Sequence, residues 1–275
     1  MYPLKIWKCF LFFSLFGAHA ACAQPLFLTL FGGASGYTGD LQSKLYNSHN
    51  VHLAFGANIK RPLNPYFSLR AGYTYLFLSA SDANNGPTLQ FRNLSFSTAI
   101  HEGSLVFEGN FFNLENVRFT PYVLAGIGFF HFNPYCLDDN SKKIYLHELG
   151  TEGQKLGIVK PYKLFQRNWI SGGGLKYKLS ETVTINYEIV LRKLNSDYID
   201  DVSTCYYLPE TSPYYTVAFR ELGTRYSDRY LKTRGSPGHD DFYYSNSLGI
   251  TLNIEDLLYQ YRKSQLIGTR NTTHF

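Results

Sequence analysis

The sequence predicts an all-β protein, an antiparallel transmembrane β-barrel of about eight strands with long extracellular loops. Two patterns predict this fold: apolar and polar residues alternate with period two in segment after segment, and the connections between segments are alternately short and long. Aromatic residues make up 17% of the chain, with 23 Tyr and 22 Phe. Such an excess without long apolar runs is typical of the aromatic girdles of membrane barrels.

The N-terminus predicts export. Lys5 and Lys8 begin a short basic region, and the apolar run Cys9–Phe16 is too short to span about 30 Å of hydrocarbon as a helix. Ala21-Cys22-Ala23 then reads as a cleavage site. We therefore expect residues 1–23 to be a signal peptide, residues 24–253 the barrel, and residues 254–275 a periplasmic C-terminal tail.

Strands follow from the alternation. Between Thr182 and Arg192, for example, the odd positions are apolar and the even ones mostly polar, which a strand sorts onto two faces and a helix does not. The same test predicts eight strands: Phe27–Tyr37, Val51–Lys60, Phe67–Phe77, Phe91–Asn110, Pro121–Asn133, Gln166–Leu179, Thr182–Arg192 and Phe242–Leu252. The apolar phase switches between Ile100 and Leu105, which predicts a β-bulge at Glu102-Gly103.

The connections predict the topology. Those at 62–65, 113–116 and 180–181 are short, whereas those at 38–50, 79–90, 134–165 and 193–240 are long. Outer-membrane barrels have short periplasmic turns and long extracellular loops, while a soluble sandwich has no reason to keep this order. We therefore expect both termini in the periplasm and four loops outside the cell.

Charged residues fall on the polar faces of the predicted strands. An eight-stranded barrel is just wide enough inside for side chains, so charges of both signs are expected to pair there, with glycines relieving crowding. The predicted lumen charge network consists of Lys60, Arg70, Glu108, Lys176 and Glu188. The alternative is a soluble sheet with these charges on its solvated face, which period-two patterning also allows.

No motif predicts catalysis, and we expect no catalytic, cofactor-binding or metal-binding residue. Gly-x-Ser-x-Gly and His-Glu-x-x-His are absent, and His101 and His131 are single residues within predicted strands. Acidic clusters at 138–139, 197–201 and 239–241 lack the spacing of a calcium loop and read as loop charge. The net charge of +5 forms no basic patch, so nucleic acid is not an expected partner.

Two cysteines remain in the predicted mature chain, Cys136 and Cys205. An even pair in an oxidising compartment is compatible with one disulfide, but the sequence leaves open whether the two meet. Lipidation at Cys22 is less favoured than simple cleavage, because His19 stands where such a site has a large aliphatic residue.

From about Gly32 to Asn253, the chain carries an ordered series of short motifs. They are Gly33–Leu41 (GASGYTGDL), Arg92–Phe96 (RNLSF), Thr120–Phe132 (TPYVLAGIGFFHF), Leu149–Gln154 (LGTEGQ), Gly172–Tyr177 (GGGLKY) and Asp197–Ser203 (DYIDDVS). In this order they resemble the PorG-type outer-membrane β-barrel family of Bacteroidetes, a component of the type IX secretion and gliding-motility machinery. The resemblance assigns no role to the loop motif of Asp197, Tyr198, Asp200, Asp201 and Val202.

The resemblance implies a non-enzymatic protein that assembles or anchors the type IX protein secretion machinery. Its expected partners are outer-membrane lipid and the periplasmic ring components of that machinery, which the short turns and the tail after Asn253 would face. One alternative is a generic OmpA/OmpX-like surface barrel for adhesion or envelope integrity, which the long outside loops favour. A membrane enzyme is a weaker alternative, supported only by His and Asp clusters.

Overall fold

The computed structural model describes residues 25–42, 50–84, 94–137, 140–205, 233–236 and 241–271. The predicted signal peptide, residues 1–23, lies outside the described residues, as do the acidic positions 138–139 and 239–240. Eight long strands dominate: β1 (Phe27–Thr38), β2 (His52–Pro62), β3 (Phe67–Ser81), β4 (Ser95–Asn110), β5 (Phe119–His131), β8 (Phe165–Lys178), β9 (Val183–Leu194) and β10 (Phe242–Asn253). Each of the eight predicted strands is present, within a few residues of its expected bounds.

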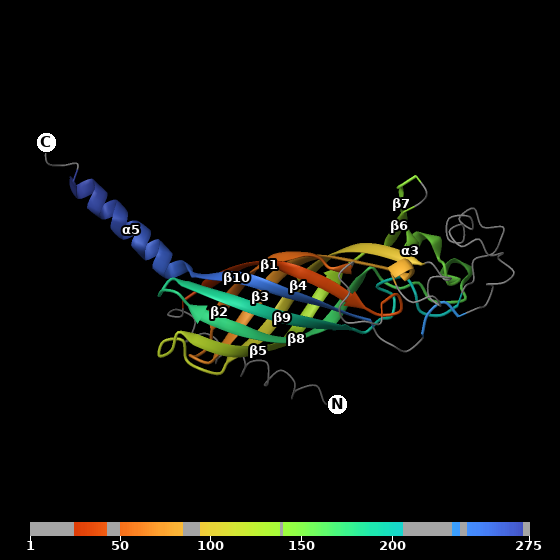
Figure 1. Cartoon of the computed structure of the whole chain (residues 1–275). Helices are drawn as coiled ribbons and strands as arrows, with labels where there is room; N and C mark the ends of the chain where they lie inside the picture. Colours follow the sequence, from red (N-terminus) through yellow and green to blue (C-terminus); the bar gives the residue numbers. More distant parts are fainter. Residues whose placement is uncertain are drawn as a thin grey trace, which may run out of the picture.

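These strands close into an antiparallel barrel (Figure 1). The ring runs β3-β2-β1-β10-β9-β8-β5-β4, and pairing of β3 with β4 completes it. β1 and β10 pair along their whole length, from Phe27 opposite Asn253 to Thr38 opposite Phe242. The predicted closed barrel is therefore confirmed, and its first and last strands are neighbours.

The barrel has two unlike ends. At the short-turn end, β2 leads to β3, β4 to β5 and β8 to β9 through brief connections, and β1 begins and β10 finishes. Helix α5 (Ile254–Asn271) follows β10 there and projects away from the barrel (Figure 1). At the long-loop end, the connection after β5 carries a hairpin of β6 (Tyr135–Leu137) and β7 (Lys143–Tyr145), helix α3 (Leu146–Leu149) and the 3-10 turn η3 (Gln154–Leu156). Another 3-10 turn, η2 (Asp82–Asn84), follows β3.

Large apolar side chains cover the outside of the barrel. Leu53 is 61% exposed and Trp169 is 56% exposed, although residues of this kind are normally buried. Every barrel strand contributes to this apolar belt: Leu30, Leu53, Ile59, Leu69, Tyr73, Leu105, Phe107, Val123, Ile127, Trp169, Leu175, Ile185, Ile189, Leu248 and Ile250. Since successive side chains of a strand point to opposite faces, the residues between them line the lumen.

The predicted bulge at Glu102-Gly103 was wrong. β4 keeps an unbroken register with β3, where Glu102 lies opposite Thr74 and Gly103 opposite Tyr73, and with β5 on its other side. The apolar phase switches for another reason: Ile100 faces inward, at a level where the barrel interior is itself apolar.

This apolar interior fills the long-loop end of the barrel. Its buried side chains come both from strands and from the loops that fold over them: Tyr37, Leu41, Leu76, Leu78, Phe96, Ile100, Phe130, Leu149, Leu194, Ile199, Val202 and Tyr243. Tyr37 meets Phe96 edge to face with ring centroids 5.0 Å apart, a favourable arrangement of two aromatic rings. The loops therefore share one hydrophobic core with the strands.

Candidate functional site

Nearer the short-turn end, the lumen holds the charge network that the sequence predicts. Glu108 of β4 accepts from Lys176 of β8, and one of its carboxylate oxygens lies 3.5 Å from Lys60 Nζ. Arg70 of β3 lies 3.5 Å from Glu108 and also binds Glu188 of β9, with Nη1–Oε2 and Nη2–Oε1 distances of 2.6 and 3.0 Å. All five residues are less than 10% exposed. The structure thus brings together every residue of the predicted network.

Tyr122 of β5 completes this network. Its hydroxyl donates to Glu188 Oε2 at 2.7 Å, and Lys176 Nζ lies 4.1 Å from the centre of its ring. Gly174 leaves room for that ring, because an added Cβ would lie 2.9 Å from Tyr122 Cε1 and 2.1 Å from the Tyr187 carbonyl oxygen. This inward glycine thus accommodates the ring of Tyr122, as expected of glycines in a narrow lumen.

A second lumen cluster, centred on Glu102, was not predicted as a unit. Arg192 Nε donates to both carboxylate oxygens of Glu102, at 2.9 and 3.0 Å. The hydroxyl of Tyr243 and Nδ2 of Asn168 donate to Oε2 of the same carboxylate, at 2.8 and 2.7 Å. The sequence did not predict this cluster because the expected bulge at Glu102-Gly103 would shift the alternation there. The pattern therefore did not assign Glu102 to the lumen or to the outer face.

Between the two charged clusters the lumen is filled. The cavity there measures about 10 Å³, which is about the space of a single water molecule. Asn58, Arg70, Glu102, Glu188 and Arg192 all line it. This cavity is therefore too small to hold a solute.

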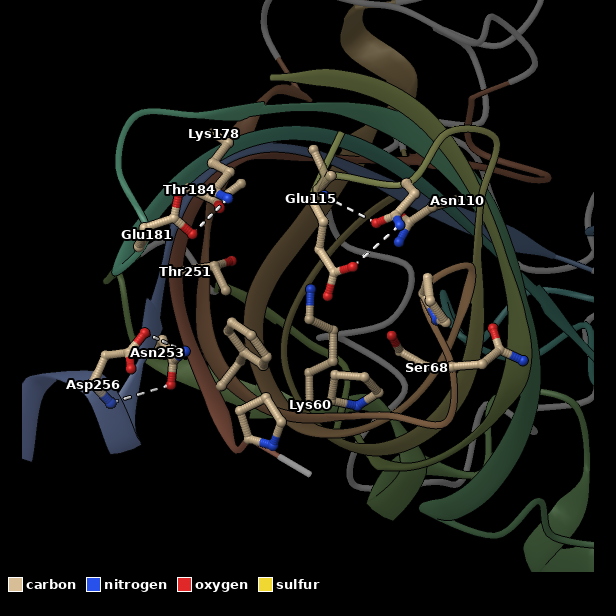
Figure 2. Close-up of a pocket in the computed structure, with 17 residues that line it drawn as sticks. Lys60, Ser68, Asn110, Glu115, Lys178, Glu181, Thr184, Thr251, Asn253 and Asp256 are labelled. Carbon is tan, nitrogen blue, oxygen red and sulfur yellow. Dashed lines mark hydrogen bonds and ion pairs between the residues drawn. The ribbon is translucent and has the colours of Figure 1, made fainter. Parts of the chain in front are cut away.

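The short-turn mouth is open, with a cavity of about 370 Å³. Figure 2 shows Lys60 extending into it, with the Lys178–Glu181 ion pair and Asp256 at the rim. Lys178 Nζ lies 2.7 Å from Glu181 Oε2, and Asn253 donates to Asp256 Oδ2 at 2.7 Å. The mouth thus mixes both charges and shows no set of groups aimed at a single ligand.

At the long-loop end, the loops are joined by a buried polar cluster, here called the loop cluster. Glu152 accepts from the backbone N–H groups of Ser203 and Thr204 at 2.8 and 3.0 Å, and Arg234 Nη1 lies 3.1 Å from its Oε1. Asp201 accepts from the hydroxyl of Thr151 at 2.7 Å and lies 3.2 Å from Arg234 Nη2. Because Glu152 and Asp201 are fully buried, the cluster ties two distant loops into one unit.

Asp201 also accepts a hydrogen bond from the Tyr162 hydroxyl at 2.8 Å. Burial raises the pKa of this carboxyl, against the opposing effect of Arg234. The Tyr162 and Tyr198 rings stack with centroids 5.0 Å apart. Tyr198 itself donates to Glu152 Oε2 at 3.3 Å.

Two other carboxyl groups meet beneath the loops, around one tyrosine. The hydroxyl of Tyr37 lies 2.6 Å from Oδ2 of Asp200 and 3.1 Å from Oδ1 of Asp241. Burial raises the pKa of Asp200 to about 8, although the Tyr37 hydrogen bond opposes the shift. Burial and the nearby Asp200 raise the pKa of Asp241 well above its usual range.

The predicted loop motif is therefore buried rather than displayed. Asp200 and Asp201 are at most 1% exposed, Val202 belongs to the hydrophobic core, and Asp197 is also buried. Its acidic residues were expected to be loop charge at the surface. The structure corrects this, because Asp200 accepts from Tyr37 of β1, and Asp201 accepts from Thr151, Tyr162 and Arg234.

The disulfide between Cys136 and Cys205 that the sequence left open is not formed. Each lies in a separate backbone pairing, Cys136 opposite Ile144 in the β6–β7 hairpin and Cys205 opposite Thr233.

No metal-binding group is found among the described residues. His101 and His131 are exposed register partners on the outer face, and the hydroxyl of Tyr73 lies 2.6 Å from His101 Nδ1. Within the ranges described above, no group of three or more His, Cys, Asp or Glu residues could hold a metal ion. Over the same ranges, no helix is both long and apolar enough to cross a membrane.

Solved structures similar to this chain are small barrels. Neisserial surface protein A is 7% identical, covering 83% of this chain and 97% of its own, with a TM-score of 0.44. Ail of Yersinia pestis, in complex with the heparin analogue sucrose octasulfate, is 9% identical. The match covers 83% of this chain and 97% of Ail, with a TM-score of 0.42. OprG of Pseudomonas aeruginosa is 10% identical, and the match covers 83% of this chain and 96% of OprG, with a TM-score of 0.40. Likenesses of this size say nothing about what this chain does.

No curated protein matches the sequence. One family model does, over residues 6–160, which is more than half of the chain. Its description is a domain of unknown function, DUF6089, and the chain belongs to this family.

Proposed function

We propose that this chain is an integral outer-membrane barrel with a structural role at the cell envelope, neither a solute channel nor an enzyme. The observation that carries the proposal is the reversed distribution of its side chains. Apolar residues of all eight barrel strands face outward, whereas buried ion pairs lie inside the barrel. A water-soluble barrel has the opposite arrangement, so the surroundings that suit this surface are lipid.

Barrel closure supports the same conclusion. Lipid offers no hydrogen-bond partner to the backbone, so a spanning sheet must leave no free edge. Here every barrel strand pairs on both sides, and each has between 11 and 16 residues. A tilted membrane strand needs about 9–11 residues, so these strands are long enough to cross and to extend beyond the bilayer.

Aromatic side chains lie on the outer face toward both ends of the belt. Near the short-turn end, the rings of Phe67 and Phe107 stack with centroids 5.3 Å apart. Near the long-loop end, Phe129 and Phe165 stack at 6.3 Å. Aromatic girdles are favoured at the two membrane–water interfaces. In the proposed orientation, the short turns and both chain ends face the periplasm and the long loops face outward.

The filled lumen and the ordered loops support a structural role, in adhesion or envelope integrity. The cavity inside the lumen is too small to hold a solute, and the buried clusters stabilise the barrel and hold its loops together. The experiment that tests the proposal has two parts. The protein is recovered from cell membranes and refolded into lipid vesicles, and its conductance is measured in planar bilayers.

We expect the protein in the outer-membrane fraction, soluble only with detergent, and without steady conductance. Recovery as a water-soluble monomer would refute the membrane role, and a stable conductance would refute the filled lumen. Trimming the long loops tests the surface role. If adhesion and envelope integrity are both unaffected, the proposed surface role is refuted.

A second candidate is a component of the type IX secretion machinery. Supporting it, three of the motifs that resemble the PorG-type family meet at the loop end, where Tyr37 reaches Asp200 and Glu152 reaches Ser203. In addition, α5 places Leu257, Leu258 and Tyr261, all exposed, on the proposed periplasmic side, where ring components would bind. Co-purification of those components, lost when residues 254–275 are deleted, would support this candidate. Intact secretion and gliding after loss of the gene would refute it.

A further inference from the structure

A hollow of about 460 Å³ lies beside the long-loop end of the barrel. It is lined from the end of β5, the loop that leads into β8, the beginning of β8 and the segment after β9. The lining residues are Phe129, Tyr162, Lys163, Phe165, Gln166, Arg167, Asn195 and Ser196. Among these described residues there are two cations and no carboxylate.

Arg167 stands beside outward-facing aromatic side chains. Arg167 is the register partner of Phe129, and both face outward along with Phe165. The next outward residue along β8 is Trp169, which is the register partner of Lys193 on β9. Arginine and lysine among aromatic side chains therefore mark this sector of the outer face, at the level where the apolar belt meets the loops.

Neutral groups of the hollow are already engaged with the protein. The side-chain nitrogen of Gln166 donates to the Lys163 carbonyl oxygen at 2.9 Å and to the Ser196 hydroxyl at 3.3 Å. These bonds fix the backbone at Lys163 and join the start of β8 to the end of β9. These hydrogen bonds hold the lining of the hollow in place, and Lys163 and Arg167 supply its positive charge.

We propose that this hollow binds the phosphate group of an anionic outer-leaflet lipid, whose acyl chains lie along the aromatic and aliphatic belt below. A guanidinium group matches two phosphate oxygens at once, and lysine adds a second positive charge. The rings of Phe129, Phe165 and Trp169 occupy the depth at which headgroups and acyl chains meet. The inference rests on the proposed membrane location and deepens it by naming the lipid chemistry.

The test uses the full mature chain refolded in a neutral detergent. Its binding to diphosphorylated lipid A is compared with binding to dephosphorylated lipid A, by titration and by native mass spectrometry. We expect the phosphorylated lipid to bind at least tenfold more tightly. Arg167→Gln should remove most of this preference, Arg167→Lys should remove part of it, and Lys163→Gln should weaken it several-fold.

The matched control is Lys178→Gln, which removes the same charge at the short-turn end and should leave the preference unchanged. Equal binding of both lipids, or equal losses in Arg167→Gln and Lys178→Gln, would overturn the proposal. Displacement of the lipid by a modest excess of inorganic phosphate would also overturn it, since the site would then be one for free phosphate. Insertion into vesicles is scored separately, so a folded, inserted barrel without phosphate preference refutes the lipid site and leaves the membrane role standing.

Discussion

Arg70 and Glu188 join opposite walls of the barrel through a two-pronged ion pair, with N–O distances of 2.6 and 3.0 Å. Three strands separate β3 from β9 in either direction around the ring, so the pair crosses its full width. Arginine suits this position because its planar guanidinium can engage both carboxylate oxygens.

Arg70→Met is expected to lower the free energy of unfolding by about 3–5 kcal/mol, because it leaves Glu188 buried without its cation. Urea unfolding of the refolded barrel in lipid vesicles measures this change. The control is Lys178→Met, whose partner Glu181 is 84% exposed at the side chain. This exposed pair is expected to contribute less than about 1 kcal/mol. Equal effects of the two substitutions would contradict the assigned role of the lumen network.

The lumen is tightly packed at Gly174, so its stability depends on side-chain volume as well as on charge. Gly174→Ala is expected to destabilise the barrel by about 1–3 kcal/mol, since the new methyl group must displace Tyr122 or the β9 backbone. Gly103→Ala serves as the control, because an added Cβ there has no atom within 4 Å. The same urea experiment compares the two variants, and similar stability for both would show that the lumen tolerates an added methyl at Gly174.

The carboxyl pair beneath the loops predicts a pH dependence. An ordinary aspartate has a pKa near 3.8, whereas that of Asp200 is raised to about 8 in the folded protein. Between these values the folded state holds a proton that the unfolded chain releases, so this contribution to stability falls as the pH rises. It is fully present below pH 4 and is lost by about pH 8.

The measurement is the urea midpoint at pH 5 and pH 9, for the wild type, Asp200→Asn and Asp241→Asn. Asparagine does not titrate, so each variant should lose less stability than the wild type over this interval. A wild-type chain with the same pH response as Asp200→Asn would exclude a raised pKa at this residue.

Glu152→Gln is expected to loosen the loops without opening the barrel. The neutral amide no longer compensates Arg234, and the N–H groups of Ser203 and Thr204 lose a charged acceptor. Hydrogen exchange followed by mass spectrometry should show at least tenfold faster exchange in residues 149–157 and 197–205. Exchange in β1 and β10 should be unchanged. Acceleration throughout the strands would mean instead that the loop cluster stabilises the whole barrel.

Much of the fold could be predicted because a half-exposed strand records its two faces in alternate residues. Lys60, Arg70 and Glu188 were assigned to the lumen on this pattern alone, and their pairing followed from the narrow interior of an eight-stranded barrel. The same rule failed at Glu102. Phe96 and Ile100 are apolar and still face inward, because the loops turn that end of the lumen into a dry core.

The loop cluster could not have been predicted from local pattern. Glu152 and Arg234 are separated by 82 positions in loops without periodicity, so nothing in the sequence says that they meet. The acidic run at Asp200-Asp201 looks like surface charge until its donors, Tyr37 and Tyr162, are placed in space. Sequence patterns report on the faces of regular elements, whereas loop contacts depend on the closed barrel that brings the loops together.

The full-length pairing of β1 with β10 sets an order on assembly. Until residues 242–253 have arrived, the sheet is an open ribbon with two unsatisfied borders, one along the first strand and the other along β9. Burying either border in hydrocarbon costs free energy, because its backbone N–H and C=O groups have no partner there. The unfinished chain must therefore be prevented from pairing with other copies until β10 closes the barrel. A product that stops short of Phe242 is therefore destined for aggregation or degradation, whatever the quality of its other strands.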